Sequence, residues 1–264
     1  MDLGLEGKSV FVSASSNGLG LGAATRFAAE GANVAIASRS RENLDRARES
    51  ILESTDCDPA SLFAVEVDLA ERDDIEAGIG ATIDEFGGLD VLVTNHPGPA
   101  NTALEETSLS MFDKGYNDVL RSVVIQCKAA LPALRDGGGA ITHNVSVAAE
   151  ALSHATVANV FRPGIYGLSK TIANEEGEHG VRSNCVAPRG VRSDRIESKI
   201  AERAEREGLR EAEVRELRVE ELPLPDMGTT EEFGRAVAFV SSPAASYTTG
   251  AVLRVDGGWS RHML

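Results

Sequence analysis

The stretch that decides the fold is residues 9–20, which read SVFVSASSNGLG. Its first five residues include the β-branched and aromatic side chains of a buried strand, and the rest is a turn of small residues that runs into an amphipathic segment. Such a turn aims backbone N–H groups and the positive end of a helix dipole at a phosphate, and it leaves no side chain where the ligand approaches. Gly18 and Gly20 suit that role, although a pair of glycines also makes a simple tight corner.

Short apolar strands alternate with longer amphipathic helices along the rest of the chain. Most of these strands lack an inside–outside pattern, which is typical of a parallel sheet covered by helices on both faces. The expected strands are residues 9–13, 33–37, 62–67, 91–94, 140–145, 182–186 and 252–255. The expected helices are residues 19–30, 41–53, 72–86, 108–134, 164–178 and 230–241. No linker or repeat divides them, so the sequence predicts one α/β domain over residues 1–264, a Rossmann-like doubly wound parallel sheet of about seven strands.

Composition narrows the possible partners. The 264 residues carry 26 Lys and Arg against 41 Asp and Glu, and the formal charge of −15 argues against binding to nucleic acids or anionic membranes. Only 5 of the basic residues are Lys and 21 are Arg, a bias that fits either an acidic surface suited to high salt or drift in a GC-rich genome. Cys57, Cys127 and Cys185 are too few and too scattered for a disulfide framework or a metal site. The start resembles no signal peptide and no apolar run reaches roughly 18 residues, so we expect a cytoplasmic protein.

The end of the second expected strand bears on the choice of cofactor. Dinucleotide-binding folds place a carboxylate there to hold a free ribose 2′-hydroxyl. This strand instead ends Ala37-Ser38-Arg39-Ser40. Arg39 between two hydroxyl side chains suits a 2′-phosphate, so we expect NADP, with NAD as the alternative in which Arg39 is an ordinary surface residue.

Tyr166 and Lys170 are the most specific chemical signal. Residues four apart share a helix face, so both side chains are expected to point into one cleft. A tyrosine ordinarily titrates near pH 10, and a neighbouring ammonium lowers its pKa by favouring the phenolate. The pair therefore predicts a general acid or base usable in neutral water.

These motifs, taken together, resemble the short-chain dehydrogenase/reductase family over nearly the whole chain. The turn at residues 13–20 resembles the family's TGxxxGxG, and Asp68-Leu69 falls where the family contacts the adenine. Three more segments match in the same order: residues 91–99 (VLVTNHPGP) the strand and NNAG loop, residues 181–188 (VRSNCVAP) the VRVNxVxPG segment, and residues 249–258 (TGAVLRVDGG) the TGxxxxVDGG segment. The loop at residues 94–99 is similar to that of the 3-oxoacyl-carrier-protein reductase homologues, a subgroup of the family.

The resemblance implies hydride transfer between NADP(H) and a small-molecule carbonyl or alcohol, with no metal. It also implies that Ser146 hydrogen-bonds the substrate oxygen, that Tyr166 moves the proton, and that Lys170 binds the nicotinamide ribose. The cofactor contacts that it implies are Ser13, Ser15, Ser16, Asn17, Gly18, Leu19, Gly20, Arg39, Asp68, Leu69, Asn95, Tyr166, Lys170, Pro188 and Ser193. A homotetramer or homodimer is implied too, although candidate contact residues such as Val123 and Ile172 suit the sheet equally.

Three positions depart from the family's pattern. Ala14 replaces a glycine beside the diphosphate, and we interpret it as tolerated. Val119 stands where a catalytic asparagine usually holds a water of the proton relay. Arg189 stands where a glycine lines the nicotinamide pocket; there it either favours an anionic substrate or faces solvent.

The spacing of the catalytic residues departs as well. Ser146 and Tyr166 are 20 positions apart, several more than in most relatives. The intervening stretch holds Ser153, a less favoured alternative to Ser146, and His154, which with His96 is either a substrate contact or an exposed loop residue.

One segment interrupts the strand–helix alternation. Residues 193–222 are dense in Glu and Arg and end at Pro223-Leu224-Pro225. A solvated surface helix explains this composition. We favour a mobile substrate lid at residues 193–226, because the segment follows the carboxyl end of a strand, where ligands bind in such sheets.

Two functional hypotheses follow. The first is an NADP-dependent reductase or dehydrogenase, possible also with NAD. The second, motivated by Val119 and the non-standard turn, is a catalytically weak NADP-binding regulatory protein. We expect the enzyme, because a degenerating site would lose Tyr166 or Lys170 early.

Overall fold

The computed structural model describes residues 1–96, 98–150 and 155–261. Its centre is one sheet in the order β3-β2-β1-β4-β5-β6-β7, with every neighbouring pair parallel, as predicted. The strands are β1 (Ser9–Val12), β2 (Asn33–Ser38), β3 (Leu62–Glu66), β4 (Val91–Thr94), β5 (Gly139–Asn144), β6 (Val181–Pro188) and β7 (Val252–Val255). The strand order reverses between β1 and β4, and ligands bind at the carboxyl ends of strands beside such a switch point.

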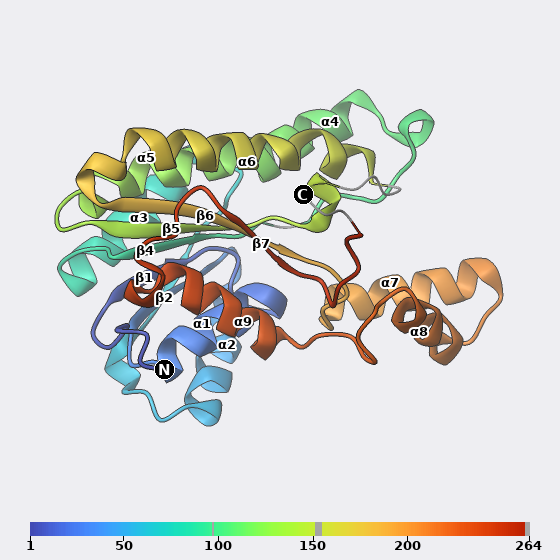
Figure 1. Cartoon of the computed structure of the whole chain (residues 1–264), viewed down its shortest axis with the longest axis horizontal. Coiled ribbons are helices and arrows are strands. Elements are labelled where there is room, and N and C mark those ends of the chain that lie inside the picture. Colours follow the sequence, from blue (N-terminus) through green and yellow to red (C-terminus); the bar gives the residue numbers. More distant parts are fainter. Residues whose placement is uncertain (97, 151–154, 262–264) are drawn as a thin grey trace.

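Helices cover both faces of the sheet (Figure 1). One layer consists of α1 (Gly18–Ala29), α2 (Arg41–Ser54) and α9 (Thr230–Ser241). The opposite layer consists of α3 (Arg72–Phe86), α5 (Ser122–Leu134) and α6 (Thr156–Glu175). The shorter α4 (Leu109–Gly115) precedes α5, and α7 (Asp194–Glu207) and α8 (Glu211–Glu220) form a hairpin that projects from the body.

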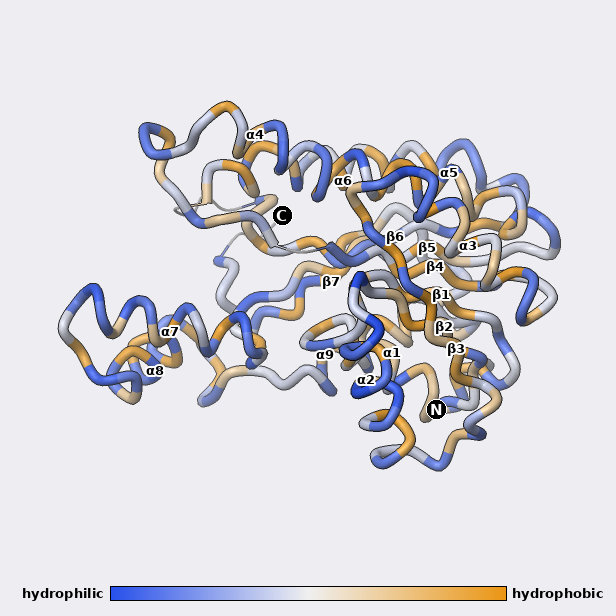
Figure 2. Tube along the Cα trace, turned by 180° about the vertical axis from the view of Figure 1, so that it is seen from behind, coloured by the Kyte–Doolittle hydropathy of each residue, from blue (hydrophilic) through white to orange (hydrophobic). Residues whose placement is uncertain are grey.

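The central strand β1 contributes to both layers of the core. Val10 and Val12 pack under α1, α2 and α9, whereas Phe11 packs under α3, α5 and α6, because successive side chains of a strand point to opposite faces. All three are buried. The strands are correspondingly apolar in Figure 2, and the outer faces of the helices are polar. Burial on both faces explains the apolar run in the sequence.

Two glycines let α1 and α9 touch backbone to backbone. A Cβ atom on Gly22 would lie 2.4 Å from the carbonyl oxygen of Thr230, and one on Gly234 would lie 2.3 Å from the carbonyl oxygen of Gly22. No side chain of any other residue type fits there without moving a helix. The helix that begins at the Gly-rich turn is thus backed directly by α9.

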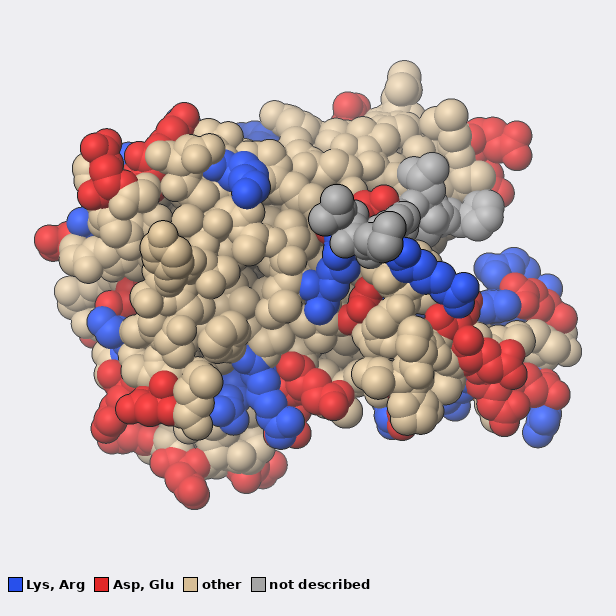
Figure 3. Space-filling view, in the orientation of Figure 1, with Lys and Arg blue, Asp and Glu red and all other residues tan. Residues whose placement is uncertain are grey.

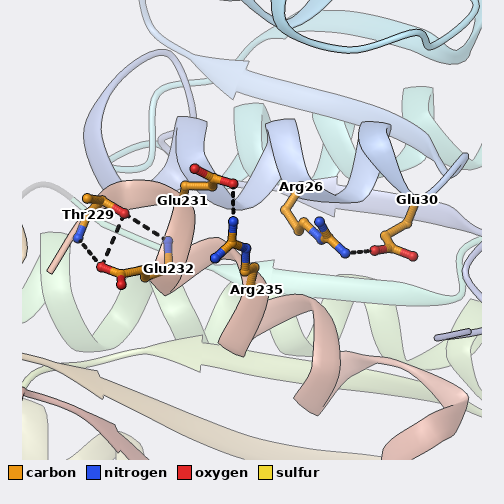
Figure 4. Close-up of polar contacts among 6 residues, drawn as sticks. All are labelled: Arg26, Glu30, Thr229, Glu231, Glu232 and Arg235. Carbon is orange, nitrogen blue, oxygen red and sulfur yellow. Dashed lines mark hydrogen bonds and ion pairs between the residues drawn. The ribbon is translucent and has the colours of Figure 1, made fainter. Parts of the chain in front are cut away.

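Polar contacts define the start of α9 beside this glycine contact. Thr229 Oγ1 accepts a hydrogen bond from the backbone N–H of Glu232 (3.1 Å), and Glu232 Oε2 accepts one from the backbone N–H of Thr229 (2.8 Å), which completes a capping box. Figure 4 shows this box and two ion pairs on the helices, Arg26 with Glu30 on α1 and Arg235 with Glu231 on α9.

The structure differs from the predicted elements in two places. The helix expected at residues 108–134 is divided by a wide π-helical turn at Tyr116–Arg121. The helix expected at residues 164–178 begins eight residues earlier, at Thr156. Pro163 lies inside this helix, although a proline is more often found in a first turn.

The segment expected as a lid is the α7–α8 hairpin, whose helices are joined at Gly208 with φ +68°. It has a small core of its own, made by Ile200, Ala204 and Val214. Acidic side chains spread over the outer surface of the body and the hairpin in Figure 3. Within the described ranges, no helix is long and apolar enough to cross a membrane, and no group of side chains has a metal-binding arrangement. Val123 and Ile172 pack into the core beneath α5 and α6.

Candidate active site

A cleft of about 720 Å³ opens at the carboxyl ends of β1, β2, β4 and β5. Its walls come from the segments that follow these strands and from α6 and α7. Most of the predicted site residues line it: Ser16, Asn17, Gly18, Leu19, Arg39, Asp68, Leu69, Asn95, Ser146, Pro188 and Ser193. The fold therefore brings the Gly-rich turn and Ser146 into one cavity, although they are far apart in the sequence.

The turn after β1 presents its backbone to the cleft. Gly18 has φ +55° and Ala14 has φ +46°, a left-handed conformation that costs a residue with a Cβ more than it costs glycine. Ala14 thus adopts a backbone conformation that favours glycine. A Cβ on Gly20 would lie 2.4 Å from the carbonyl oxygen of Ala14 and 2.7 Å from Asn95 Nδ2, so only glycine fits there.

Ser13 and Ser15 hold this turn in place and do not line the cleft. Ser13 Oγ donates to the carbonyl oxygen of Asn95 (2.8 Å) and accepts from its N–H (2.7 Å). Ser15 Oγ donates to the carbonyl oxygen of Val12 (2.7 Å) and accepts from the N–H of Ala37 (2.9 Å). Both serines are fully buried and their hydroxyls are engaged within the protein, and their contact with the cofactor stays a prediction. Gly20 does not line the cleft either and acts through its close packing.

The cleft reaches the end of β2, where Arg39 lies. Its side chain is exposed and makes no hydrogen bond or ion pair with any residue that the structure describes. Ser16 Oγ donates to Ser38 Oγ (3.0 Å), which ties the Gly-rich turn to the end of β2. Asp68 lines the same end, and its Oδ1 accepts from the N–H of Ala70 (3.0 Å). A free guanidinium here can pair with a phosphate.

Ser146 lies at the end of β5, inside the cleft. Its Oγ accepts a hydrogen bond from the N–H of Ala148 (3.2 Å), and no acceptor for its own hydroxyl proton is found within the described residues. Beside it, Asn144 Nδ2 donates to Asn95 Oδ1 (2.9 Å), which joins the ends of β4 and β5. The hydroxyl is thus held by the backbone and is able to donate to a ligand oxygen.

Tyr166 and Lys170 lie outside the cleft, so the predicted placement is wrong. Because α6 starts at Thr156, Tyr166 is ten residues along the helix, about 15 Å from its start. Burial, and then the negative charge of Glu150, raise the pKa of the Tyr166 hydroxyl, which is the opposite of the expected lowering. Lys170 is exposed and lies against Gly250.

Ala158 and Arg162 take the place on α6 that this pair was expected to occupy. They are four residues apart, as Tyr166 and Lys170 are, and both line the cleft. Arg162 Nε is buried and has no hydrogen-bond partner, while other parts of the side chain remain accessible from the cleft. Burial lowers the pKa of Arg162 to about 10, so the guanidinium is still charged at neutral pH. Placing the start of the helix at Thr156 would have revealed these two residues in the sequence.

Val119 is buried in the core, whereas the adjacent Asp118 lines the cleft. Val119 is buried in the core beneath α5 and α6, so it contributes no polar group to a proton relay. Asp118, which sequence reasoning passed over, lines the cleft and pairs with Lys114 (2.6 Å). The wide π-helical turn at Tyr116–Arg121 contains both residues.

The remaining residues that the sequence suggested as substrate contacts differ in where they lie. His96 is buried and lines the cleft. Arg189 also lines it, but its guanidinium pairs with Glu221 (2.7 Å) and lies 3.8 Å from the centre of the Trp259 ring. Ser153 and His154 lie outside the described residues.

Three features of the cleft fit a nicotinamide dinucleotide phosphate. The turn at Gly18 and Gly20 leaves room for a diphosphate at the start of α1, where backbone N–H groups are free. The unpaired Arg39 suits a 2′-phosphate, and Asp68 and Leu69 also line the cleft. Pro188 and Ser193 line the part of the cleft after β6.

Comparisons with known proteins agree with this geometry. A family model described as enoyl-(acyl carrier protein) reductase matches residues 13–260. The 3-oxoacyl-[acyl-carrier-protein] reductase FabG of Staphylococcus aureus is 30% identical over 259 residues, 95% of this chain and 97% of that protein. Dehydrogenase/reductase SDR family member 4 of Oryctolagus cuniculus is 29% identical over 257 residues, 96% of this chain and 94% of that protein.

A solved structure resembles the whole chain. The L-sorbose reductase of Gluconobacter frateurii, complexed with NADPH and L-sorbose, superimposes with a TM-score of 0.92 at 28% identity and covers 100% of both chains. The family match, the relatives and the shared fold lead to the same assignment. The chain belongs to the short-chain dehydrogenase/reductase family of enzymes, whose relatives named above are dehydrogenases and reductases.

Proposed function

We propose that the protein binds NADP(H) in this cleft and catalyses hydride transfer between the cofactor and a small-molecule carbonyl or alcohol, 3-oxoacyl compounds among the candidates. The observation that carries the proposal is that Ser146 and the Gly-rich turn line the same cleft. The NADPH complex of the similar L-sorbose reductase supports the choice of cofactor.

The chain's own residues have distinct tasks in this reaction. The cofactor, when bound, supplies or accepts the hydride. Ser146 donates a hydrogen bond to the reacting oxygen and thereby stabilises the negative charge that develops there during reduction. Tyr166 does not line the cleft, so the proton that completes the alcohol comes from water, which enters past exposed side chains such as Arg39 and Arg195.

A direct assay tests the proposal. The full chain is expected to oxidise NADPH in the presence of at least one member of a panel of 3-oxoacyl esters, 3-oxo acids and simple ketones, measured by the loss of absorbance at about 340 nm. The same preparation should bind NADPH in calorimetry. Binding without turnover across the panel would contradict catalysis and support the regulatory alternative.

Replacing Arg39 tests the preference for NADP. We expect Arg39→Ala to raise the KM for NADPH by about 10- to 100-fold, because one charge-assisted contact to a phosphate contributes about 1.5–3 kcal/mol. The KM for NADH should change by less than about twofold. Arg41→Ala is the matched control, since Arg41 lies two residues away and already pairs with Asp45 (3.0 Å). An equal rise for both cofactors would refute a 2′-phosphate contact.

A further inference from the structure

Three cationic side chains from two helices meet in the cleft. Arg162 belongs to α6, and Arg195 and Lys199 belong to the first two turns of α7. All three line the cleft together with Ser146. The charge of Arg195 lowers the pKa of both Arg162 and Lys199, and the charge of Arg162 lowers the pKa of Lys199, as expected of neighbouring cations.

None of the three has a carboxylate partner among the described residues. Arg162 and Lys199 make no hydrogen bond or ion pair with that part of the chain, and Arg195 donates to the carbonyl oxygens of Gly98 (2.7 Å) and Pro99 (2.8 Å). Other arginines of the same hairpin pair with acids, as Arg203 does with Glu207 (3.0 Å). In a chain of formal charge −15, this group of unpaired cations is a specific feature of the cleft.

Holding these cations together costs free energy. Burial, and then the charges of Arg195, Arg162 and Arg218, lower the pKa of Lys199 to about 8, with only Glu202 acting in the opposite direction. Buried like charges are tolerated when a ligand or ion of opposite charge completes the site. An anion bound among the three would remove the repulsion and supply the missing hydrogen-bond acceptor for Arg162.

The anionic groups of the cofactor are accounted for at other parts of the cleft. The diphosphate has the turn at Gly18 and the start of α1, and the 2′-phosphate has Arg39 at the end of β2. Arg162 instead lies one turn from Ala158 on α6, and its helix follows Ser146 in the chain. All three cations line the cleft together with Ser146, the residue assigned to the reacting oxygen, so we place them at its substrate end.

We propose that Arg162, Arg195 and Lys199 form an anion subsite, and that the substrate is a carbonyl or alcohol compound bearing a carboxylate or phosphate group. This inference rests on the proposed function and adds the substrate class to it. Ser146 holds the reacting oxygen, while the subsite holds the charged group and orients the carbonyl. Ala158, with its small side chain, leaves space between them.

Calorimetry of the full chain tests the subsite, both with saturating NADP+ and without it. The probes are acetoacetate, inorganic phosphate and the neutral methyl acetoacetate, at low ionic strength. We expect acetoacetate or phosphate to bind at least tenfold more tightly than methyl acetoacetate, and the tighter of the two anions identifies the charged group of the substrate. Arg162→Leu and Lys199→Met should each weaken anion binding at least tenfold and change NADP+ affinity less than twofold.

Arg203→Leu is the matched control, because Arg203 is a paired cation on the same helix, and its anion affinity should stay within twofold. Lys199→Met keeps the test decisive if Arg162→Leu does not fold, because Lys199 is partly exposed. Binding of both anions, acetoacetate and phosphate, no tighter than that of methyl acetoacetate, or unchanged anion affinity in both variants, would overturn the subsite. If the wild-type chain bound the anions but not NADP+, the proposed function would be overturned and the subsite would stand.

Discussion

Gly20→Ala is expected to weaken NADPH binding by about 100-fold, equivalent to about 3 kcal/mol. The added Cβ would lie 2.4 Å from the carbonyl oxygen of Ala14 and 2.9 Å from Ser15 Cα, so the turn must move away from α1. Such a movement disturbs the hydrogen bonds that tie Ser13 to Asn95, after β4, and Ser15 to Ala37 of β2. Titration by fluorescence or calorimetry measures the affinity.

Gly80→Ala is the matched control for this substitution. Gly80 lies within α3, and no atom outside its own helix segment lies within 4 Å of an added Cβ. Alanine is the better helix former, so this variant should be as stable as the wild type or more stable by about 0.5–1 kcal/mol, with NADPH affinity unchanged. Comparable NADPH affinity in the two variants would show that the turn does not contact the cofactor.

Ser146→Ala and Tyr166→Phe are expected to have opposite outcomes. Removing the Ser146 hydroxyl should lower kcat by about 100-fold, because a lost hydrogen-bond donor to a developing oxyanion costs about 2.7–4 kcal/mol. Tyr166→Phe should leave kcat within about twofold, because its hydroxyl is buried beside Glu150 and outside the cleft. Steady-state kinetics with an accepted substrate measures both.

Two results would contradict this assignment. If Tyr166→Phe abolished turnover while NADPH binding remained, the tyrosine would reach the reacting oxygen in a conformation unlike this one. If Ser146→Ala retained full activity, another group would hold that oxygen. The thermal midpoints of both variants serve as controls, and Tyr166→Phe should stay close to the wild type, because the change removes one hydroxyl and keeps the buried ring.

The comparison between β1 and α6 shows which features the sequence predicts well. The strand, the turn and the start of α1 depend on neighbouring residues, since apolar runs, small residues and glycine act within a few positions, and the predicted bounds agree with the structure to within one residue. The start of α6 depends on tertiary packing, because Val157, Ala158 and Ile165 are buried on either side of Pro163. Tertiary contacts overrode the local signal of Pro163 and Gly164, and the predicted pair, Tyr166 and Lys170, lies about two turns further along α6 than Ala158 and Arg162, which line the cleft.

The place of Arg162 in the cleft could not be predicted from the sequence for a related reason. Its surroundings include Arg195 from a helix more than thirty residues later in the chain, and no local pattern records that proximity. The formal charge of −15 does not indicate this proximity either, because the net charge of the whole chain does not show where its positive side chains lie. The family motif matches Tyr166 and Lys170 by their spacing in the sequence. The residues that line the cleft are those that the fold brings together in space.

The backbone contact between α1 and α9 has a consequence for the order in which the protein matures on the ribosome. The Gly-rich turn is made from the first twenty residues, yet the helix that follows it contacts Thr230 and Gly234 near the other end of the chain. Until translation has passed α9 and its residues have left the exit tunnel, α1 lacks this neighbour, and the part of its surface that α9 covers is open to water. The first residues of the cleft are therefore synthesised early, but the support of α1 by α9 forms only when most of the chain has been synthesised.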